Sequence, residues 1–236
     1  MPSPPPPQAT TDTTKMKYGL IIPTPEEAVN VPADPGCVIA GGNGAGKAAG
    51  CAAAAELIFL HGCRTILLWG SVGATYGSGL RPGDILVGSR VAYRDYDLRP
   101  VLGCTRIGEV PDYTPGWGQF PEALAAGLRN AVKTLFPDNF RDRDFPLASG
   151  DIFCIPEAED ANGIEADAMI YDMEAAAVLH FCTMLNRKAN LDIQVGMVKV
   201  ITNLPQDENC DDFAAAAEKY CTPLNRAIPD IIRLLN

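Results

Sequence analysis

Short apolar segments alternate with helical patterns along this 236-residue chain, and this alternation limits the fold more than any other feature. Seven segments rich in Val, Ile and Leu are bounded by Gly, Pro or Asp, which is typical of strands. They cover residues 17–23, 36–42, 64–71, 83–93, 145–151, 167–173 and 193–203. Helical patterns cover residues 46–61, 121–136, 173–187 and 211–235. Because strands that are apolar on both faces need cover on both sides, the sequence predicts a single α/β domain with a mixed β-sheet flanked by helices.

The first fifteen residues are rich in Pro, Ser and Thr and contain little that could be buried. We therefore expect a disordered tail over residues 1–15 and the folded domain over residues 16–236. The chain has no run of eighteen apolar residues, and its start lacks the charged and apolar regions of a signal peptide. These features predict a cytoplasmic protein.

Charge and cysteine content narrow the classes of partner. The chain carries 29 acidic and 19 basic residues, a net charge of −10, and has no cluster of Lys or Arg. Nucleic acids and anionic membranes both require such clusters, so we expect a small-molecule partner instead. The eight cysteines form no C-x-x-C pair and have no histidine at ligand spacing, which predicts neither a metal site nor a disulfide framework.

A glycine-rich turn follows the second predicted strand. Its spacing over residues 41–47 matches the phosphate loop of nucleotide triphosphatases. That loop needs a Ser or Thr after the lysine to bind magnesium, and this chain has Ala48. The glycines also match part of the dinucleotide-binding fingerprint. That fingerprint requires an acidic residue about 20 positions later, at the end of the next strand, and this chain has none there. The turn therefore indicates a strand, a tight bend and an alanine-rich helix, without an ATP site.

Ligands of α/β folds bind at the carboxyl ends of strands, so these ends hold the candidate residues. The segment "YDMEAAA" places Asp172 and Glu174 at a junction between a strand and a helix. A glutamate in the first helical turn is favoured by the helix dipole. From these residues alone, a capping role and a functional role both remain open.

The motifs taken together are more specific than any one of them. "GNGAGK", "GSVGA", "LRPGDILVGSRVAYRDYDL", "SGDIF", "DMEAAA" and "VKVITN" follow one another in an order and spacing that resembles the nucleoside phosphorylase and nucleosidase superfamily. Within it, the chain is most similar to the nucleosidases that act on methylthioadenosine, adenosylhomocysteine or futalosine. The resemblance extends over nearly the whole chain from Met16 and implies an enzyme with a nucleoside phosphorylase-like fold.

The resemblance also implies roles for the matching residues. Glu174 would bind the ribose hydroxyls and stabilise the positive charge that develops on the sugar as the N-glycosidic bond breaks. The other substrate-binding residues that it implies pack against the sugar, hold the base or form the turn and floor of the site: Met173, Asp172, Phe153, Cys154, Ser71, Gly73, Gly44 and Gly46.

The resemblance favours water over phosphate as the nucleophile. Phosphorylases of this superfamily carry a phosphate-binding arginine two residues before the glycine of the "GSVGA" motif, where this chain has Leu68. A phosphorylase that recruits phosphate through Arg94 or Arg99 is the alternative within the enzyme class.

Two positions depart from the methylthioadenosine nucleosidase pattern. At the end of "VITN" these enzymes have an aspartate that acts as a general acid, whereas this chain has Asn203, and Asp207 could supply an acid four residues later. The amide of Asn203 can donate a hydrogen bond to a purine nitrogen or to a 6-oxo group, which favours 6-oxopurine substrates over adenine. The water-activating glutamate of the family aligns with Ala28, so a shift of one residue would assign this role to Glu27, with Glu26 as the other candidate. A solvated pair at a helix start, favoured by Pro25, is an equal alternative for these two glutamates.

The sequence thus leads us to expect an N-ribosyl hydrolase of a purine-type nucleoside, such as a 6-oxopurine or 5′-substituted nucleoside, that uses no metal or organic cofactor. Its catalytic residues would be Glu174, Asn203 and Glu27 or Glu26. We expect a homodimer, with a higher oligomer as the alternative. A nucleoside-binding protein with little turnover is the alternative from another class, because the acid is replaced and the first-loop base is shifted.

Overall fold

A computed structural model describes residues 17–42, 44–75, 77–110, 117–152, 168–204 and 212–236. Its strands are β1 (Tyr18–Ile22), β2 (Val38–Gly41), β3 (Thr65–Ala74), β4 (Ile85–Val87), β5 (Arg90–Tyr93), β6 (Gly118–Gln119), β7 (Leu147–Ser149), β8 (Ile170–Asp172) and β9 (Gln194–Asn203). Its helices are α1 (Lys47–Ala55), the π-helical turn η1 (Glu56–Leu60), α2 (Arg99–Leu102), α3 (Glu122–Leu135), α4 (Ala175–Ala189), α5 (Phe213–Arg226) and α6 (Ile228–Leu235). The predicted tail lies outside the described residues.

The nine strands form one mixed sheet around the long strands β3 and β9. β3 pairs in parallel with β1 on one side and with β9 on the other, and β2 extends the sheet beyond β1. The end of β3 pairs antiparallel with β8, which continues through parallel pairs to β7 and β5. Because β1, β3 and β9 run parallel, their carboxyl ends meet at one edge of the sheet.

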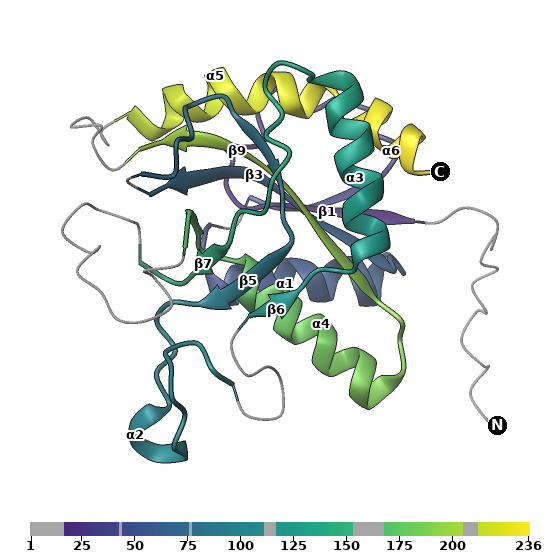
Figure 1. The fold of residues 1–236 in the computed structure, drawn as a ribbon. Coiled ribbons are helices and arrows are strands. Elements are labelled where there is room, and N and C mark those ends of the chain that lie inside the picture. The colour runs from purple at the N-terminus through teal and green to yellow at the C-terminus, as the bar shows by residue number, and fades with distance from the viewer. Residues whose placement is uncertain (1–16, 43, 76, 111–116, 153–167, 205–211) are drawn as a thin grey trace, which may run out of the picture.

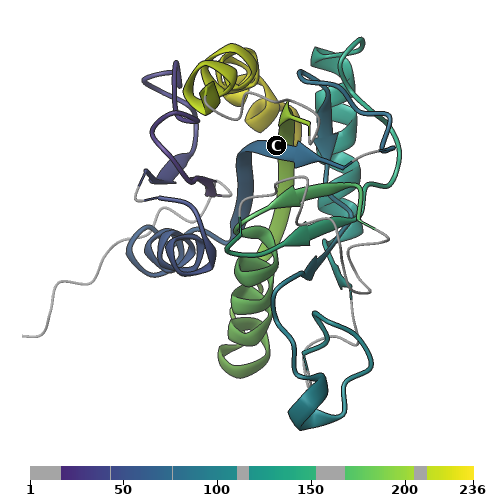
Figure 2. The same cartoon turned by 90° about the vertical axis from the view of Figure 1, so that its left-hand side faces the viewer.

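Helices cover both faces of this sheet. Figure 1 shows α1 and α4 below the sheet, α5 above it and α3 and α6 on the right; residues of α3, α5 and α6 share one apolar cluster, and Figure 2 gives the view from the side. Each face has its own apolar core, in which Val178 of α4 belongs to one cluster and Leu224 of α5 to the other. Trp69 of β3 is fully buried in the second cluster. The predicted single α/β domain with a mixed sheet and helices on both sides is therefore confirmed.

The boundaries differ from the sequence prediction in several places. The strand predicted over residues 83–93 is divided into β4 and β5, because β4 pairs with β9 whereas β5 pairs with β7. The last predicted helix is divided at Ala227; the new helix begins at Ile228, and its second residue, Pro229, lacks the N–H that a continuous helix would use. The short elements α2 and β6 are not predicted from the sequence. Within the described part of the chain, no helix is both long and apolar enough to cross a membrane.

Candidate active site

A cavity of about 430 Å³ lies at the carboxyl ends of the central strands. Its lining comes from segments that are far apart in the sequence: the loop after β1, the turn before α1, the ends of β3, β8 and β9, and the start of α5. The described residues that line it are Thr24, Glu27, Ala45, Ser71, Val72, Gly73, Ile152, Tyr171, Asp172, Met173, Glu174, Asn203 and Phe213. Most of this lining is apolar, and its polar groups include three buried carboxylates, Glu27, Asp172 and Glu174, and the amide of Asn203.

Glu174 lies at the N-cap of α4, with only 3% of its surface exposed. Its Oε1 accepts a hydrogen bond of 2.8 Å from the backbone N–H of Gly46 in the glycine-rich turn. Gly46 has φ of +111°, a conformation that disfavours a side chain, which explains why the turn needs glycine there. Oε2 of Glu174 lies 3.9 Å from Nζ of Lys199. The turn that resembles a phosphate loop thus donates to a carboxylate of the protein itself.

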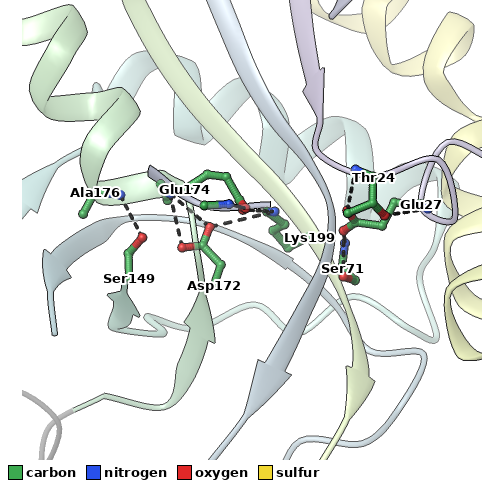
Figure 3. Close-up of polar contacts among 10 residues, drawn as sticks. Thr24, Glu27, Ser71, Ser149, Asp172, Glu174, Ala176 and Lys199 are labelled. Carbon is green, nitrogen blue, oxygen red and sulfur yellow. Dashed lines mark hydrogen bonds and ion pairs between the residues drawn. The ribbon is translucent and has the colours of Figure 1, made fainter. Parts of the chain in front are cut away.

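Asp172 is buried beside Glu174 and caps the same helix. Its two carboxylate oxygens accept the backbone N–H of Ala175 at 3.2 and 3.3 Å, and Ser149 also donates to it. Ser149 Oγ in turn accepts the N–H of Ala176 (Figure 3). Oδ2 of Asp172 lies 3.8 Å from Nζ of Lys199. Asp172 therefore fixes the start of α4, and with it the position of Glu174.

Burial of this cluster changes how its groups bind protons. Burial raises the pKa of Glu174 from its ordinary value of 4.5 to about 7; Lys199 opposes this increase, and the charge of Asp172 adds to it. Burial likewise raises the pKa of Asp172, again opposed by Lys199. Burial lowers the pKa of Lys199, but the carboxylates of Asp172 and Glu174 outweigh this effect and raise the pKa overall. Glu174 is thus poised to exchange a proton near neutral pH.

Glu27 lies in the loop after β1 and is also almost fully buried. Its Oε1 accepts hydrogen bonds of 2.6 Å from both the backbone N–H and the hydroxyl of Ser71 (Figure 3). Its Oε2 accepts the N–H of Thr24 at 3.2 Å, and the Thr24 hydroxyl accepts the N–H of Glu27, in the manner of a capping box. Gly70, with φ of +125°, leaves room for this carboxylate, because a Cβ there would lie 2.6 Å from Oε1. Glu26 is exposed and does not line the cavity.

Asn225 of α5 anchors the loop that carries Glu27. Its amide nitrogen donates to the carbonyl oxygens of Glu27 and Val29 at 2.7 and 2.8 Å. Its amide oxygen accepts the indole N–H of Trp69 at 3.0 Å. Asn225 is fully buried, so these hydrogen bonds are not exchanged with water and hold the loop against the core.

Asn203 ends β9 and forms another wall of the cavity beside Gly73. Its Oδ1 accepts a hydrogen bond of 3.1 Å from the hydroxyl of Thr202, which leaves the amide NH₂ group as a donor. That NH₂ group makes no hydrogen bond to the residues that the structure describes. Met173 and Ser71 also line the cavity.

The other predicted residues have different positions. Gly44 is exposed and lies outside the cavity lining, whereas Gly46 contacts Glu174 from behind. Leu68 is buried in the core. The guanidinium of Arg94 lies over the Tyr171 ring at 5.0 Å, and Arg99 is paired with Asp97 at the surface; neither arginine lines the cavity. Phe153, Cys154 and Asp207 fall outside the described residues.

Sequence reasoning missed several residues of this site. Lys199 is a charged residue inside the apolar strand "VGMVKVIT", and this exception to the pattern was a usable signal. Thr24, Ile152, Phe213 and Asn225 carried no comparable signal. In the described segments, no three His, Cys, Asp or Glu side chains are grouped so that they could hold a metal ion.

Comparisons with known proteins agree with this architecture. The sequence model described as the phosphorylase superfamily matches residues 28–233. No curated protein matches the sequence.

Similar solved structures cover most of the chain. The futalosine hydrolase of Helicobacter pylori has a TM-score of 0.73 and 18% identity, over 92% of this chain and 97% of that one. The methylthioadenosine/adenosylhomocysteine nucleosidase of Colwellia psychrerythraea, in complex with adenine, has a TM-score of 0.76 and 21% identity, over 93% and 96%. An aspartate-to-asparagine variant of the Helicobacter pylori nucleosidase, with methylthioadenosine in its active site, has a TM-score of 0.75 and 18% identity, over 93% and 99%.

Proposed function

This chain belongs to the phosphorylase superfamily, and from that premise we propose that it hydrolyses the N-glycosidic bond of a purine-type nucleoside. The observation that carries the proposal is that two buried carboxylates, Glu174 and Glu27, and the Asn203 amide line one cavity. The nucleosidases similar in structure bind adenine or methylthioadenosine in the solved complexes, so ligands of this class suit the fold.

Glu174 binds the ribose in this proposal. Its carboxylate accepts hydrogen bonds from the sugar hydroxyls, and these bonds favour the ionised form over the neutral one. As the bond between the sugar and the base lengthens, positive charge develops on the sugar, and a carboxylate held in a buried site stabilises that charge more strongly than water would. The bond from Gly46 and the capped start of α4 fix the carboxylate in advance, so little reorganisation accompanies the reaction.

Glu27 activates the water that attacks the sugar. Its carboxylate faces the cavity and is held by Ser71 and Thr24, so it can take the proton of a water molecule bound next to it. The hydroxyl group is added to the anomeric carbon, the base leaves with the electrons of the broken bond, and Glu27 then returns its proton to the solvent from which the base is protonated. Of the two adjacent glutamates, the buried one is favoured, because Glu26 is exposed to solvent.

Asn203 binds the departing base. Its NH₂ group donates a hydrogen bond but keeps its protons, so the base takes its proton from water. A donor at this position fits the carbonyl oxygen of a 6-oxopurine better than the amino group of adenine. We therefore propose an oxopurine base for this site, with the group at the 5′ position left open.

Hydrolysis is favoured over phosphorolysis by the lining of the cavity. Among the described lining residues there is no arginine or lysine that could bind phosphate, and Leu68 is buried in the core. Arg99 is already paired with Asp97, and Arg94, whose guanidinium lies over the ring of Tyr171, is not among the described lining residues.

Binding without turnover is the second candidate, and Asn203 is the observation that favours it. An asparagine cannot protonate the leaving base, and the Helicobacter pylori nucleosidase variant with an asparagine in place of an aspartate has methylthioadenosine in its active site. A cytoplasmic homodimer remains our proposal for the location and assembly of the enzyme.

Base release tests both candidates directly. The protein is incubated with inosine, futalosine, methylthioadenosine, adenosine or uridine, with and without phosphate, and the free base is measured by chromatography. We expect hypoxanthine release from an oxopurine nucleoside in phosphate-free buffer. Release that requires phosphate would identify a phosphorylase, release of adenine alone would contradict the role of Asn203, and binding without any release would identify a binding protein.

A further inference from the structure

Lys199 places a positive charge beneath the cavity. It lies in the middle of β9 with 1% of its side chain exposed, and its ammonium group is 3.8 Å from Asp172 and 3.9 Å from Glu174. Figure 3 shows the side chain reaching toward these two carboxylates. Lys199 does not belong to the described lining of the cavity, so any effect on a ligand must act through the carboxylates.

The surroundings of Lys199 are strongly acidic for a buried site. Asp172 comes from β8, Glu174 from the start of α4 and Glu27 from the loop after β1, and all three interact with its charge. The thiol of Cys221 on α5 is the fourth titratable group that acts on it. Three carboxylates therefore share one ammonium group. Since like charges in a buried site repel one another, the ammonium group is the positive charge that offsets them.

The geometry shows that charge, rather than a directed hydrogen bond, is the main effect of Lys199. Both distances to the carboxylates exceed those of a hydrogen bond between nitrogen and oxygen. Glu174 and Asp172 have other hydrogen-bond donors, from Gly46 and Ala175. Replacing Lys199 by a neutral side chain of similar length thus removes the charge and leaves those hydrogen bonds in place.

We propose that Lys199 is a positioning residue whose charge keeps the Glu174 carboxylate ionised and ready to bind a sugar. This inference rests on the proposed function, because the ionised form of Glu174 is the one that accepts hydrogen bonds from ribose. Burial already raises the pKa of Glu174 to about 7 in the presence of Lys199, which lowers it. Without the ammonium group, Glu174 would hold a proton at neutral pH. Its neutral carboxyl group would then no longer stabilise the positive charge that develops on the sugar.

The first test is the pH dependence of kcat/KM for Lys199→Met, Lys199→Arg and a control variant. The control is Met197→Ala, a fully buried, uncharged position two residues earlier on the same strand. In the wild-type protein, activity should fall as Glu174 is protonated on the acidic side. Lys199→Met should move this acidic limb up by about one pH unit or more, whereas Lys199→Arg and Met197→Ala should leave it in place. A Lys199→Met profile that is reduced equally at every pH would overturn the proposal.

The second test needs no activity and separates this inference from the proposed function. Carboxyl groups whose pKa is raised by folding contribute stability that is present at low pH and lost as pH rises through the raised pKa. The unfolding temperature of Lys199→Met should therefore fall further below that of the wild type as pH increases from 5 to 8. Met197→Ala should show a difference that does not change with pH. If the difference in unfolding temperature between Lys199→Met and the wild type did not change with pH, the charge role would be refuted even if the protein hydrolyses nucleosides. If the hydrolysis assay failed, this stability test would still decide the charge role.

A double variant covers the case in which Lys199→Met does not fold. Adding Asp172→Asn removes one negative charge together with the positive one, so the charge balance of the cluster is partly restored. We expect the double variant to fold and to be more stable at pH 8 than Lys199→Met alone. If it were no more stable than the single variant, the charge balance would not be what Lys199 provides.

Discussion

Replacing Glu174 by glutamine should make the protein less active and more stable at alkaline pH. The substitution preserves the shape of the side chain and an oxygen that can accept the Gly46 N–H, but it removes the charge. At low pH the wild-type carboxyl group is protonated, so the two proteins should have similar stability there. The difference should emerge as Glu174 ionises in the wild type.

The magnitude follows from the proton equilibrium of Glu174. Burial raises its pKa from 4.5 to about 7, so its folded form favours the protonated state. Stability that depends on this group is complete below about pH 4.5 and is lost as pH rises through about 7. The difference between these two values corresponds to a free energy on the order of 3 kcal/mol. For a chain of this length, that would separate the unfolding temperatures by several degrees at pH 8.

The activity should change in the opposite direction. Loss of a charge-assisted hydrogen bond to the sugar costs about 1.5–3 kcal/mol, which corresponds to a decrease in kcat/KM of roughly ten- to over a hundredfold. Thermal unfolding from pH 5 to 8 and base release at pH 8 measure the two effects on the same samples. Glu218→Gln, at an exposed position of α5, is the matched control and should change neither quantity.

Two results would refute this reasoning. If the stability difference between Glu174→Gln and the wild type stayed constant from pH 5 to 8, the pKa of Glu174 would not be raised by burial. If kcat/KM stayed within about threefold of the wild type, Glu174 would not bind the sugar through its charge.

Three further substitutions test the other walls of the site. Glu27→Gln should lower kcat/KM by about a hundredfold or more through loss of the general base, whereas Glu26→Gln at the exposed neighbour should stay within about threefold; steady-state kinetics of base release would detect either failure. Asn203→Asp should raise adenine release relative to hypoxanthine release, because a carboxyl group can accept from an amino group and can donate a proton; an unchanged ratio in the nucleoside panel would contradict the role of Asn203. Asn225→Leu leaves the carbonyls of Glu27 and Val29 and the buried indole N–H without their partner, so it should destabilise the protein by about 1–3 kcal/mol in chemical denaturation, and a neutral effect would show that the loop does not depend on this anchor.

Local patterns in the sequence were sufficient for the framework and for part of the site. Alternating apolar strands and helices predicted the mixed α/β sheet, and the rule that ligands bind at strand ends selected the segments that line the cavity. The junction of a strand with an alanine-rich helix made Asp172 and Glu174 candidates, and the resemblance to the superfamily assigned the sugar-binding role to Glu174. The pairing partners of strands were harder to predict, since the division between β4 and β5 depends on contacts with β9 and β7 that no local pattern specifies.

Contacts between distant segments explain what the sequence left undecided. Glu26 and Glu27 are adjacent and chemically identical, and they are distinguished by the burial of Glu27 against Ser71 and the exposure of Glu26. Asn225 lies 198 residues from Glu27 along the chain, so nothing in its own neighbourhood indicated that it holds the first loop. Lys199 was recognisable as an exception in an apolar strand, but its partners depend on how β8 and β9 are placed.

The buried carboxylates relate the stability of the fold to the chemistry of the proposed reaction. In the free protein, the carboxyl groups of Asp172 and Glu174 face the single charge of Lys199, and the excess negative charge that forms when both ionise destabilises the folded state. The sugar of a nucleoside in its ground state is neutral, so its binding offsets little of this excess negative charge. The sugar becomes positive only as its bond to the base breaks, and at that point the excess charge is neutralised most completely. The same electrostatic arrangement that costs stability in the empty site therefore favours the transition state over the bound nucleoside, which is why neutralising Glu174 should raise stability and lower activity together.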